Sequence, residues 1–503
     1  MLVLGNKLDI YQEQVIKNNN KSLLVIAGAG SGKTLTILGK IKYLVEVKKI
    51  AQEEIIVVTF TNNASNSVRK KLSLENLDRV KSFTFHKLAM DILNNSIEIA
   101  DNNILFDIVN YFIKVKVLNS NYIMKLILKY FDIHIYFNTK DRYIKFINEN
   151  NKKIEKLTKT IISFITKLKC NNYKLSDFNF FLLQIKKQIN YFKYKKEKIL
   201  LIIIINAYIE YTYYLKENNE LDFDDIIISA TDKIKTFYNY KNIKYIIIDE
   251  YQDISYIRLL LIKEIINKTD AKIMAVGDDY QSIYGFSGSK VSLFLEFNKY
   301  FNDSKIMYLK YTYRNSKELV DAANMFIMKN NKQIEKEILS NKNLSKPIKI
   351  IYYKNIIYSL KELLNKMEKE NFLILGRNNF DVKFILDSEV KLNNNKIIYE
   401  KNKNLNINYM TIHKSKGLEE DNVILINLID DLYGFPSKLR EDKIFRLFNE
   451  KELAYYEERR LLYVALTRTK NNVYILAPKN HYSVFVRELE QILKKLQLQQ
   501  KGK

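Results

Sequence analysis

Residues 27–34 read AGAGSGKT, between the apolar run LLVI at 23–26 and an amphipathic segment that begins at Leu35. A strand, a glycine-rich turn and a helix in this order are the setting of a phosphate-binding loop. The glycines let the backbone curl so that successive N–H groups face one anion. The lysine would reach the outer phosphates, and the threonine hydroxyl suits Mg²⁺. A purely structural turn is the alternative to this nucleotide site, which would consist of Ala27, Gly28, Ala29, Gly30, Ser31, Gly32, Lys33 and Thr34.

Length and charge limit what the chain can be. Its 503 residues, 47% of them hydrophobic, should divide into about three or four units. The formal net charge of +25 is spread along the chain and favours a polyanionic partner. The alternative is that a Lys-, Asn-, Ile- and Tyr-rich composition reflects an AT-rich coding sequence. The charge therefore supports a nucleic-acid partner without establishing one.

Cysteine content and hydropathy indicate the compartment. A single cysteine, Cys170, excludes a disulfide framework and a Cys-ligated zinc or iron–sulfur site within one chain. The most apolar stretch, residues 200–205, ends at Asn206 and is too short to span a bilayer, and the N-terminus lacks a signal pattern. We expect a soluble cytoplasmic protein without a membrane partner, nucleoid-associated in a cell or, if viral, acting in the host cell.

Polar and aromatic side chains follow two further strand patterns. The buried pattern at 55–58 runs into TFTN, and SFTFH at 82–86 repeats the arrangement. Ligands of open parallel sheets bind at the carboxyl edge of the strands. Phe60 is therefore placed to stack on a base, and Thr61 or Asn62 to hold a phosphate.

A long helical pattern separates these strands from the next ones. From about residue 88 to 215, apolar residues recur at three- and four-residue spacing with Lys and Asn between them. The pattern contains no catalytic constellation and ends in an acidic turn, LDFDD at 221–225. We expect an inserted helical subdomain with a lysine-rich face that could follow a nucleic-acid backbone; a solvated face is the alternative for any single lysine.

Paired carboxylates end the apolar strand pattern at 244–248. Asp249 could hold Mg²⁺ through water, and Glu250 could orient and deprotonate the water that attacks a γ-phosphate. The dipeptide alone is common. Downstream of a phosphate loop and after an apolar strand, it predicts a hydrolytic centre.

Further polar and aromatic residues complete the pattern. In GDDYQSIYGF at 277–286, Gln281 could sense the γ-phosphate, while Tyr284 and Phe286 could stack on bases. Gln12, upstream of the phosphate loop, could read an adenine edge; a solvated residue at a helix start is the alternative.

Together these segments resemble the motifs of the UvrD/Rep/PcrA family of superfamily 1 helicases, in the family's order. The first half carries AGAGSGKT, TFTN, TFH, LDFDD, IIDEYQD and GDDYQSIYGF. LKYTYRNS at 309–316, YMTIHKSKGLE at 409–419 and EERRLLYVALTR at 457–468 resemble the fourth, fifth and sixth motifs. The resemblance runs from Leu8 to about Ala477.

This resemblance implies an α/β fold of two RecA-like parallel-sheet P-loop domains that sandwich ATP, with a helical insertion in the first and little or no insertion in the second. It also implies that Gln12 reads adenine and that Tyr313 stacks on it. Arg314 and Arg468 would contact the γ-phosphate, and Glu419 would join the nucleotide to the second sheet. The expected units are 1–87 and 216–295 for the first domain, 88–215 for the helical subdomain, 296–480 for the second domain and 481–503 for a C-terminal helix and tail.

The interval between two motifs is short. Arg314 and Thr411 are only 97 residues apart, and strand patterns at 348–353 and 372–375 already occupy part of that interval. Little chain remains for the large helical insertion that most family members carry there. We expect a second lobe made of one RecA-like unit.

The resulting functional hypothesis is an ATP- and Mg²⁺-dependent DNA helicase or translocase that moves 3′ to 5′ on single-stranded DNA, in repair, replication or recombination. Its partners would be single-stranded and 3′-tailed duplex DNA and a loading or repair protein. Alternatives are a translocase that displaces bound proteins without processive unwinding and, less favoured because the catalytic residues are intact, a DNA-binding scaffold. The predicted catalytic residues are Lys33, Glu250, Gln281, Arg314 and Arg468, the metal ligands Thr34 and Asp249, and the DNA contacts Phe60, Thr61, Asn62, His86, Tyr284 and Phe286.

Overall fold

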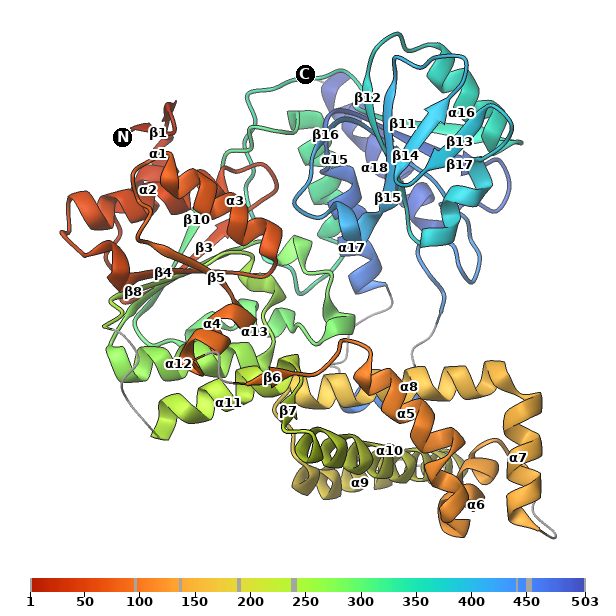
Figure 1. Ribbon diagram of the computed structural model, residues 1–503. Coiled ribbons are helices and arrows are strands. Elements are labelled where there is room, and N and C mark those ends of the chain that lie inside the picture. Colours follow the sequence, from red (N-terminus) through yellow and green to blue (C-terminus); the bar gives the residue numbers. More distant parts are fainter. Residues whose placement is uncertain are drawn as a thin grey trace.

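Two α/β lobes and one helical unit make up the described part of the chain (Figure 1). The computed structural model describes residues 2–94, 97–134, 138–187, 191–236, 242–439, 442–448 and 455–501. The two lobes lie side by side, and the helical unit lies below them in the view of Figure 1. Each lobe has its own sheet.

The sheet of the first lobe has six strands, all of them parallel. Its central strands are continuous apolar runs because helices cover both faces. Helices α1, α2 and α3 pack on one face, and α4, α11 and α12 on the other. In spatial order the strands are β10 (Ser304–Leu309), β3 (Ser22–Ala27), β9 (Lys272–Gly277), β8 (Tyr245–Ile248), β4 (Ile55–Thr59) and β5 (Lys81–Thr84). The helices are α1 (Ile10–Lys17), α2 (Lys33–Glu46), α3 (Asn62–Ser73), α4 (Phe85–Ile92), α11 (Phe223–Thr236) and α12 (Tyr256–Thr269), with α13 (Val291–Leu295), α14 (Phe297–Tyr300) and the short strands β1 (Leu2–Val3) and β2 (Asn6–Lys7) beside them.

Two of the expected domain boundaries are wrong. We expected the second domain to begin at residue 296, but β10 pairs along its whole length with β3 and belongs to the first sheet. We also expected the helical subdomain to begin at residue 88. Instead, α4 packs in the core of the first lobe, where Leu88 and Ile92 are buried. A helix next to a sheet and a helix in a bundle share one periodicity, so the pattern alone did not separate them.

The helical unit is connected to the first lobe through two short parallel strands, β6 (Glu98–Ile99) and β7 (Glu220–Leu221). Its longest helix, α10 (Tyr191–Glu217), is long and apolar enough to cross a membrane. However, residues such as Leu201, Ile204 and Ala207 are fully buried among the other helices, which is typical of a core helix in a bundle. The other helices are α5 (Ile104–Lys114), α6 (Asn121–Tyr130), α7 (Thr139–Glu149), α8 (Asn151–Cys170) and α9 (Phe178–Lys186).

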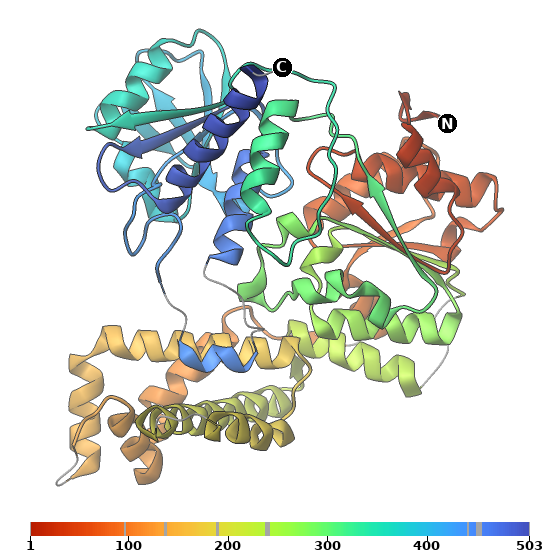
Figure 2. The ribbon, with the colours of Figure 1, turned by 180° about the vertical axis from the view of Figure 1, so that it is seen from behind.

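The second lobe has a seven-stranded sheet with five parallel strands and an antiparallel hairpin at one edge. Helices α15, α17 and α18 pack on one face, where Figure 2 shows α15 and α18 side by side, and α16 packs on the other. The strands are, in order, β11 (Ile348–Tyr353), β17 (Thr469–Pro478), β16 (Glu420–Leu425), β12 (Asn371–Gly376), β15 (Asn406–Thr411), β14 (Lys396–Tyr399) and β13 (Val390–Asn393). The helices are α15 (Lys317–Ile327), α16 (Ile356–Asn365), α17 (Tyr456–Leu466) and α18 (Val484–Lys501).

The second lobe carries no inserted helical domain in residues 379–404, all of which are described. This interval forms a 3-10 helix, η7 (Asn379–Ile385), and the β13–β14 hairpin. The expected fold, two parallel-sheet lobes with a helical insertion only in the first, is therefore confirmed; the hairpin makes the second sheet mixed.

One segment of the second lobe lies in the helical unit. Residues 442–448 follow β16 and precede α17 in the chain, yet the side chains of Ile444, Phe445 and Phe448 are buried in the core of the helical bundle. Arg446 forms an ion pair with Glu197 of α10 at 2.5 Å. This segment ties the helical unit to the second lobe at a point that the sequence did not indicate.

Candidate nucleotide and nucleic-acid sites

A cavity of about 450 Å³ lies between the two lobes. Its volume is within the usual range for ligand-binding pockets. The phosphate loop, β8 and β9 of the first lobe supply one wall, and the chain after β10, the turn before β16 and the end of α17 supply the other. Its lining includes Ala29, Gly30, Ser31, Gly32, Lys33, Thr34, Glu250, Gln281, Tyr313, Arg314, Gly417, Glu419 and Arg468, with Leu4, Asn6, Leu35, Leu38 and Lys71 at its periphery.

Residues 28–32 form the turn between β3 and α2 that the sequence predicts. Gly30 and Gly32 have φ angles of 72° and 75°, which side chains rarely adopt. A Cβ atom on Gly30 would also lie 2.5 Å from the Cβ atom of Arg314. Gly32 caps α2 without a side-chain hydrogen bond, so the first N–H groups of that helix face the cavity as donors for an anion.

Lys33 and the two carboxylates after β8 form a largely buried charged cluster. Nζ of Lys33 lies 3.0 Å from Oε1 of Glu250. Burial alone would lower the pKa of Lys33, but Glu250, Asp249 and Asp278 outweigh it and raise that pKa. Burial and the charge of Glu250 raise the pKa of Asp249. Burial would also raise the pKa of Glu250, but Lys33 and Lys416 outweigh it and lower that pKa, so Glu250 is the carboxylate held in its charged form.

Glu250 is fixed by an unusual backbone and by a residue that sequence analysis missed. Its φ of 53° is left-handed, which costs a non-glycine residue about 1–3 kcal/mol and is frequent at functional sites. Nε2 of Gln252 donates to Oε2 of Glu250 at 2.5 Å. Oε1 of the same amide accepts from the backbone N–H of Asp278 at 2.9 Å. Gln252 thereby joins the ends of β8 and β9; its place in IIDEYQD was the available signal.

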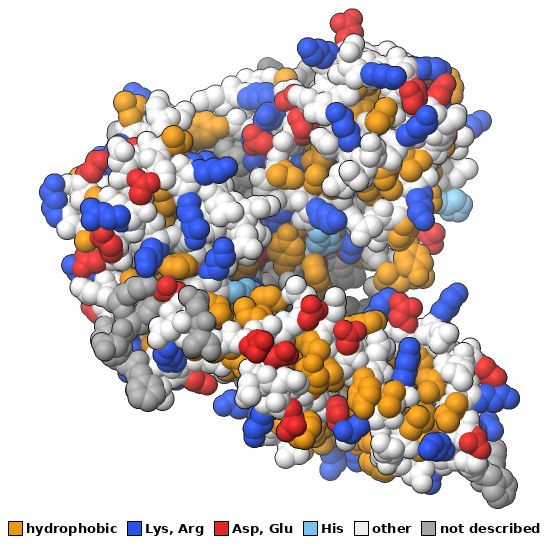
Figure 3. Space-filling model, viewed as in Figure 1, with side chains coloured by type: hydrophobic (Ala, Val, Ile, Leu, Met, Phe, Trp, Pro, Cys, Tyr) orange, Lys and Arg blue, Asp and Glu red, His pale blue; other side chains and the backbone are white. Residues whose placement is uncertain are grey.

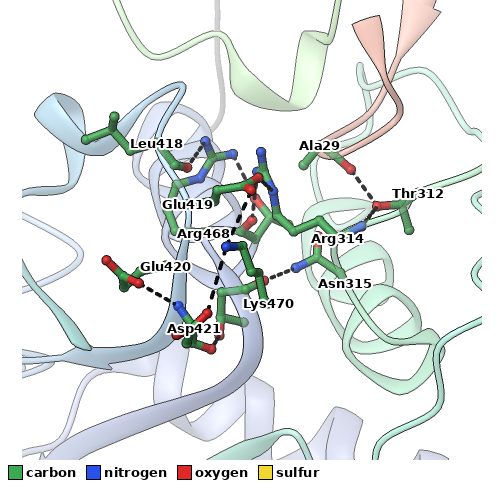
Figure 4. A network of polar contacts seen from close by, with 12 residues as sticks. Ala29, Thr312, Arg314, Asn315, Leu418, Glu419, Glu420, Asp421, Arg468 and Lys470 are labelled. Carbon is green, nitrogen blue, oxygen red and sulfur yellow. Dashed lines mark hydrogen bonds and ion pairs between the residues drawn. The ribbon is translucent and has the colours of Figure 1, made fainter. Parts of the chain in front are cut away.

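Two arginines line the other wall of the cavity and lie close together (Figure 4). Arg314 lies on the connection between the sheets and pairs with Glu419 at 2.7 Å. Arg468, two residues after α17, donates to Oε1 of Gln281 and to the carbonyl oxygen of Leu418, each at 3.2 Å. Burial, followed by the charge of Arg314, lowers the pKa of Arg468 to about 9, which leaves it charged at neutral pH.

Gln12 and Tyr313 both lie beside Gly32. A Cβ atom on Gly32 would be 2.5 Å from Nε2 of Gln12 and 3.8 Å from a ring carbon of Tyr313. Gln12 is buried and forms a capping box with Asp9 at the start of α1. The ring of Tyr313 is 60% exposed, and its hydroxyl donates to Asp9 at 2.6 Å. An exposed ring and a buried amide beside the loop are a suitable pair for a base.

The predicted metal ligands fit a metal shared with phosphate. Thr34 lines the cavity, and Asp249 is buried at the end of β8. Among the described residues, no group of three or more His, Cys, Asp and Glu side chains could hold a metal by itself. One hydroxyl and one carboxylate suit Mg²⁺, which takes few protein ligands beside phosphate oxygens and water.

An aromatic cluster spans the two lobes near this cavity. Phe286 is 55% exposed, and its ring lies 6.0 Å from that of Tyr284 and 5.5 Å from that of His413. His413 belongs to a 3-10 helix, η8 (Ile412–Ser415), of the second lobe. It lies in the fifth motif, at 409–419, but is not among the DNA contacts predicted from the sequence. Figure 3 shows the hollow between the lobes, with hydrophobic, basic and histidine side chains on its walls.

Comparison with known proteins identifies the family. The UvrD/REP helicase N-terminal domain matches residues 8–302, and the UvrD-like helicase C-terminal domain matches residues 383–480. The chain belongs to the UvrD/REP helicase family.

Curated relatives agree with this assignment. ATP-dependent DNA helicase Rep of Buchnera aphidicola subsp. Acyrthosiphon pisum is 30% identical over 77% of this chain and 56% of the relative. DNA helicase IV of Escherichia coli K12 is 27% identical over 97% of this chain and 71% of the relative. ATP-dependent DNA helicase PcrA of Bacillus subtilis is 26% identical over 69% of this chain and 42% of the relative. The chain spans little more than half the length of the Rep relative.

In this UvrD/REP family member, the other predicted DNA contacts are partly engaged in packing. Phe60 is half-buried against Phe85 at 5.3 Å. The ring of His86 lies 5.0 Å from that of Phe223, and burial together with Arg258 lowers the pKa of His86 to about 4. The Thr61 hydroxyl caps α3, whereas Asn62 is exposed at the start of that helix. The structure thus brings Tyr284 and Phe286 together more clearly than the earlier motif residues.

A second-lobe lysine that sequence analysis did not select enters the carboxylate cluster. Nζ of Lys416 lies 2.5 Å from Asp253 and 4.0 Å from Glu250. It also donates to the carbonyl oxygen of Gln281 at 2.7 Å. Lys416 therefore connects the second lobe of this helicase-family chain to the backbone of Gln281.

Proposed function

We propose that this chain is an ATP-dependent DNA motor that moves 3′ to 5′ on single-stranded DNA and acts in DNA repair, replication or recombination. The observation that supports it most is the single cavity where Lys33 and Glu250 of the first lobe face Arg314 and Arg468. A phosphate-binding loop, a carboxylate base and opposed arginines are the groups that phosphoryl transfer to water needs.

Each side chain has a part in hydrolysis. The loop N–H groups and Lys33 bind the β- and γ-phosphates, and Glu250 orients the attacking water and accepts its proton. Gln281 contacts the γ-phosphate, and the two arginines stabilise the charge that develops on it. Thr34 and Asp249 would hold Mg²⁺, which supplies charge neutralisation on the phosphate oxygens. Gln12 and Tyr313 hold the adenine.

Coupling to DNA follows from the distribution of these groups. Closure of the cleft brings Arg468 and Arg314 to the nucleotide, and the same closure moves His413 relative to Phe286. Stacking on aromatic side chains tolerates any base sequence, which suits a motor that steps along DNA. The alternating grip of two lobes, driven by hydrolysis, would produce translocation. The partners would be single-stranded and 3′-tailed duplex DNA with a loading or repair protein, in the cytoplasm.

A second candidate function is translocation that displaces bound proteins without processive duplex unwinding. The observation that favours it is that the segment 379–404 is short and forms only η7 and a hairpin. Translocation requires the two lobes and a stacking track, whereas strand separation gains from a further domain at the duplex.

The decisive measurement is ATP turnover with and without oligo(dT), followed by unwinding of duplexes with a 3′ or a 5′ tail. We expect turnover that oligo(dT) stimulates and unwinding only from the 3′ tail. Turnover that does not respond to oligo(dT) would refute the motor, and equal use of both tails would refute the polarity. Stimulated turnover with removal of a bound protein but no strand separation would select the second candidate.

A further inference from the structure

A loop of the second lobe contacts the end of β9 in the first lobe. It follows α15, and its Ile334 packs against the first-lobe core. Nζ of Lys336 lies 2.5 Å from Oδ1 of Asp278 and 2.6 Å from Oδ1 of Asp279. The Lys336 side chain is 3% exposed, and both carboxylates are fully buried.

The ion cluster of Lys336, Asp278 and Asp279 is also in contact with an aromatic ring. Nζ of Lys336 also lies 3.6 Å from the centroid of the Tyr280 ring. Burial alone would lower the pKa of Lys336, but the two aspartates outweigh it and raise that pKa. Buried charges are tolerated only when they are paired and hydrogen-bonded, and a hydrophobic replacement is often as stable. Stability alone is therefore a weak reason for a lysine here.

The cluster leads directly to Gln281. While Oδ1 of Asp278 contacts Lys336, Oδ2 of Asp278 accepts from Nε2 of Gln281 at 2.7 Å. Because an amide has one oxygen and one NH₂ group, this bond fixes which end of Gln281 faces the cavity. Its Oε1 atom then accepts from Arg468. Without Lys336, the Asp278 carboxylate would lose the cation that holds it in place.

The same loop also contacts α17, the helix that precedes Arg468 in the chain. Nε2 of Gln333 donates to Asp279 at 2.6 Å, and its Oε1 accepts from Arg460 of α17 at 3.5 Å. Asn330 donates to the carbonyl oxygen of Tyr456, also in α17, at 3.1 Å. Movement of α17 can thus reach Asp278 through the loop as well as through Arg468.

We propose that Lys336, supported by Gln333, is a positioning residue for hydrolysis: through Asp278 it orients the Gln281 amide toward the γ-phosphate and toward Arg468. This rests on the proposed ATPase function. Lys336 does not touch nucleotide and does not line the nucleotide cavity. Its effect should therefore appear in kcat, not in nucleotide affinity.

The test is a double-mutant cycle on the full chain, with turnover in saturating oligo(dT) and affinity for a fluorescent ATP analogue. Gln281→Ala should lower kcat by roughly 10²-fold. Lys336→Met should lower kcat by about tenfold or more, with analogue affinity changed less than about threefold. The double variant should be no slower than Gln281→Ala alone, because Lys336 is proposed to act on kcat only by positioning Gln281. Lys336→Arg should recover part of the loss.

Lys361→Met is the matched control, because Lys361 also bridges two carboxylates, Asp387 and Glu389, at 2.6 and 2.5 Å but on the second lobe. It should leave kcat unchanged. Independent, multiplicative losses, or wild-type kcat in Lys336→Met, would overturn the inference. If Lys336→Met fails to fold, Gln333→Leu replaces it in the cycle under the same criteria. A wild type without ATP turnover would instead refute the proposed function.

Discussion

Arg468 of the second lobe donates from Nη2 to Oε1 of Gln281 in the first lobe at 3.2 Å. The carbonyl oxygen of Gln281 accepts a hydrogen bond at 2.7 Å from Lys416, another cation of the second lobe. Gln281 is therefore held by the opposite lobe at both its side chain and its backbone. A change in the angle between the lobes would therefore move or break the contacts of this glutamine. Because Gln281 also lines the nucleotide cavity, it can couple the position of the lobes to the state of the nucleotide.

The first prediction concerns the phosphate-binding lysine and the base. Lys33→Ala should abolish ATP turnover, because no other described cation of the first lobe pairs with Glu250 inside the cavity. Glu250→Gln should lower turnover by about 10² or more while nucleotide binding persists. Steady-state turnover and binding of a fluorescent ATP analogue separate the two effects.

Lys70→Ala is the control for this pair, since Lys70 is exposed on α3 and should be silent. Near wild-type turnover in Glu250→Gln would remove Glu250 as the base.

Local and non-local features differed in how well they could be predicted. The phosphate loop was predictable because β3, the glycine turn and α2 are contiguous, and Asp249 and Glu250 were recognisable because they end an apolar strand. The pairing of β10 with β3 was not, since parallel partners can lie anywhere in the chain. The contacts of Lys336 and Gln252 with Asp278 likewise depend on distant segments that meet only in the fold.

Residues 442–448 illustrate a further limit. Their apolar residues indicate burial but not the partner, and the structure places them in the helical unit, not in the adjacent second-lobe core. Burial can be inferred from residue type, whereas the choice between two available cores depends on three-dimensional proximity. The same applies to Leu88, which packs in the first lobe although its periodicity continues into that of the helical unit.

The second prediction concerns DNA binding. Affinity for oligo(dT) should fall steeply with salt, because phosphate contacts release counterions. Phe286→Ala should weaken binding by roughly 1–3 kcal/mol without changing the salt slope, since stacking involves no counterion. Fluorescence anisotropy titrations at several salt concentrations measure both quantities.

Tyr358→Ala is a suitable comparison, because Tyr358 is 68% exposed on α16, on the face of the second sheet opposite to α17. It should bind like the wild type. Unchanged affinity in Phe286→Ala would mean that this ring serves packing alone.

The third prediction concerns stability and pH. Burial, with Arg377 and Lys416, lowers the pKa of His413 to about 4 from an ordinary value of 6.5. The unfolded chain therefore binds a proton at His413 as the pH falls below about 6.5, whereas the folded chain does not until about 4. Stability from the neutral ring is present above pH 6.5 and is lost as the pH falls through this window. His413→Phe keeps a ring beside Phe286 but does not titrate.

The measurement is the difference in Tm between His413→Phe and wild type from pH 7.5 to 5, which should shift in favour of the variant as the pH falls. Burial raises the pKa of Asp224 and Asp253 to about 6, aided by the charge of Asp222 at Asp224 and opposed by Lys416 at Asp253. This acts in the opposite direction but is present in both proteins. A flat difference for His413→Phe would contradict the prediction.

The last prediction concerns the small interval 379–404. The family resemblance implies an inserted domain in this region of the second lobe, one that rotates and regulates unwinding by a monomer. In this chain η7 and the β13–β14 hairpin occupy the whole interval. The parts needed for translocation remain, namely the cavity between the lobes, Arg314 and Arg468, and the ring cluster around Phe286. We therefore expect translocation without efficient unwinding by a single molecule.

Two single-turnover measurements at one protein per DNA test this expectation. Arrival at the 5′ end of a labelled single strand should proceed with ATP, whereas a long 3′-tailed duplex should be opened only when several molecules share the tail, when a partner protein is added or when force is applied. Additional molecules, a partner protein or force should help because each opposes re-annealing of the strands or backward slippage of the motor. Without an inserted domain, we expect a single molecule to prevent neither step efficiently. Lys33→Ala should fail in both assays, which separates motor activity from passive strand capture. Efficient unwinding of the long duplex by one unassisted molecule would show that the two lobes and the helical unit suffice, and the small interval would then have no bearing on strand separation.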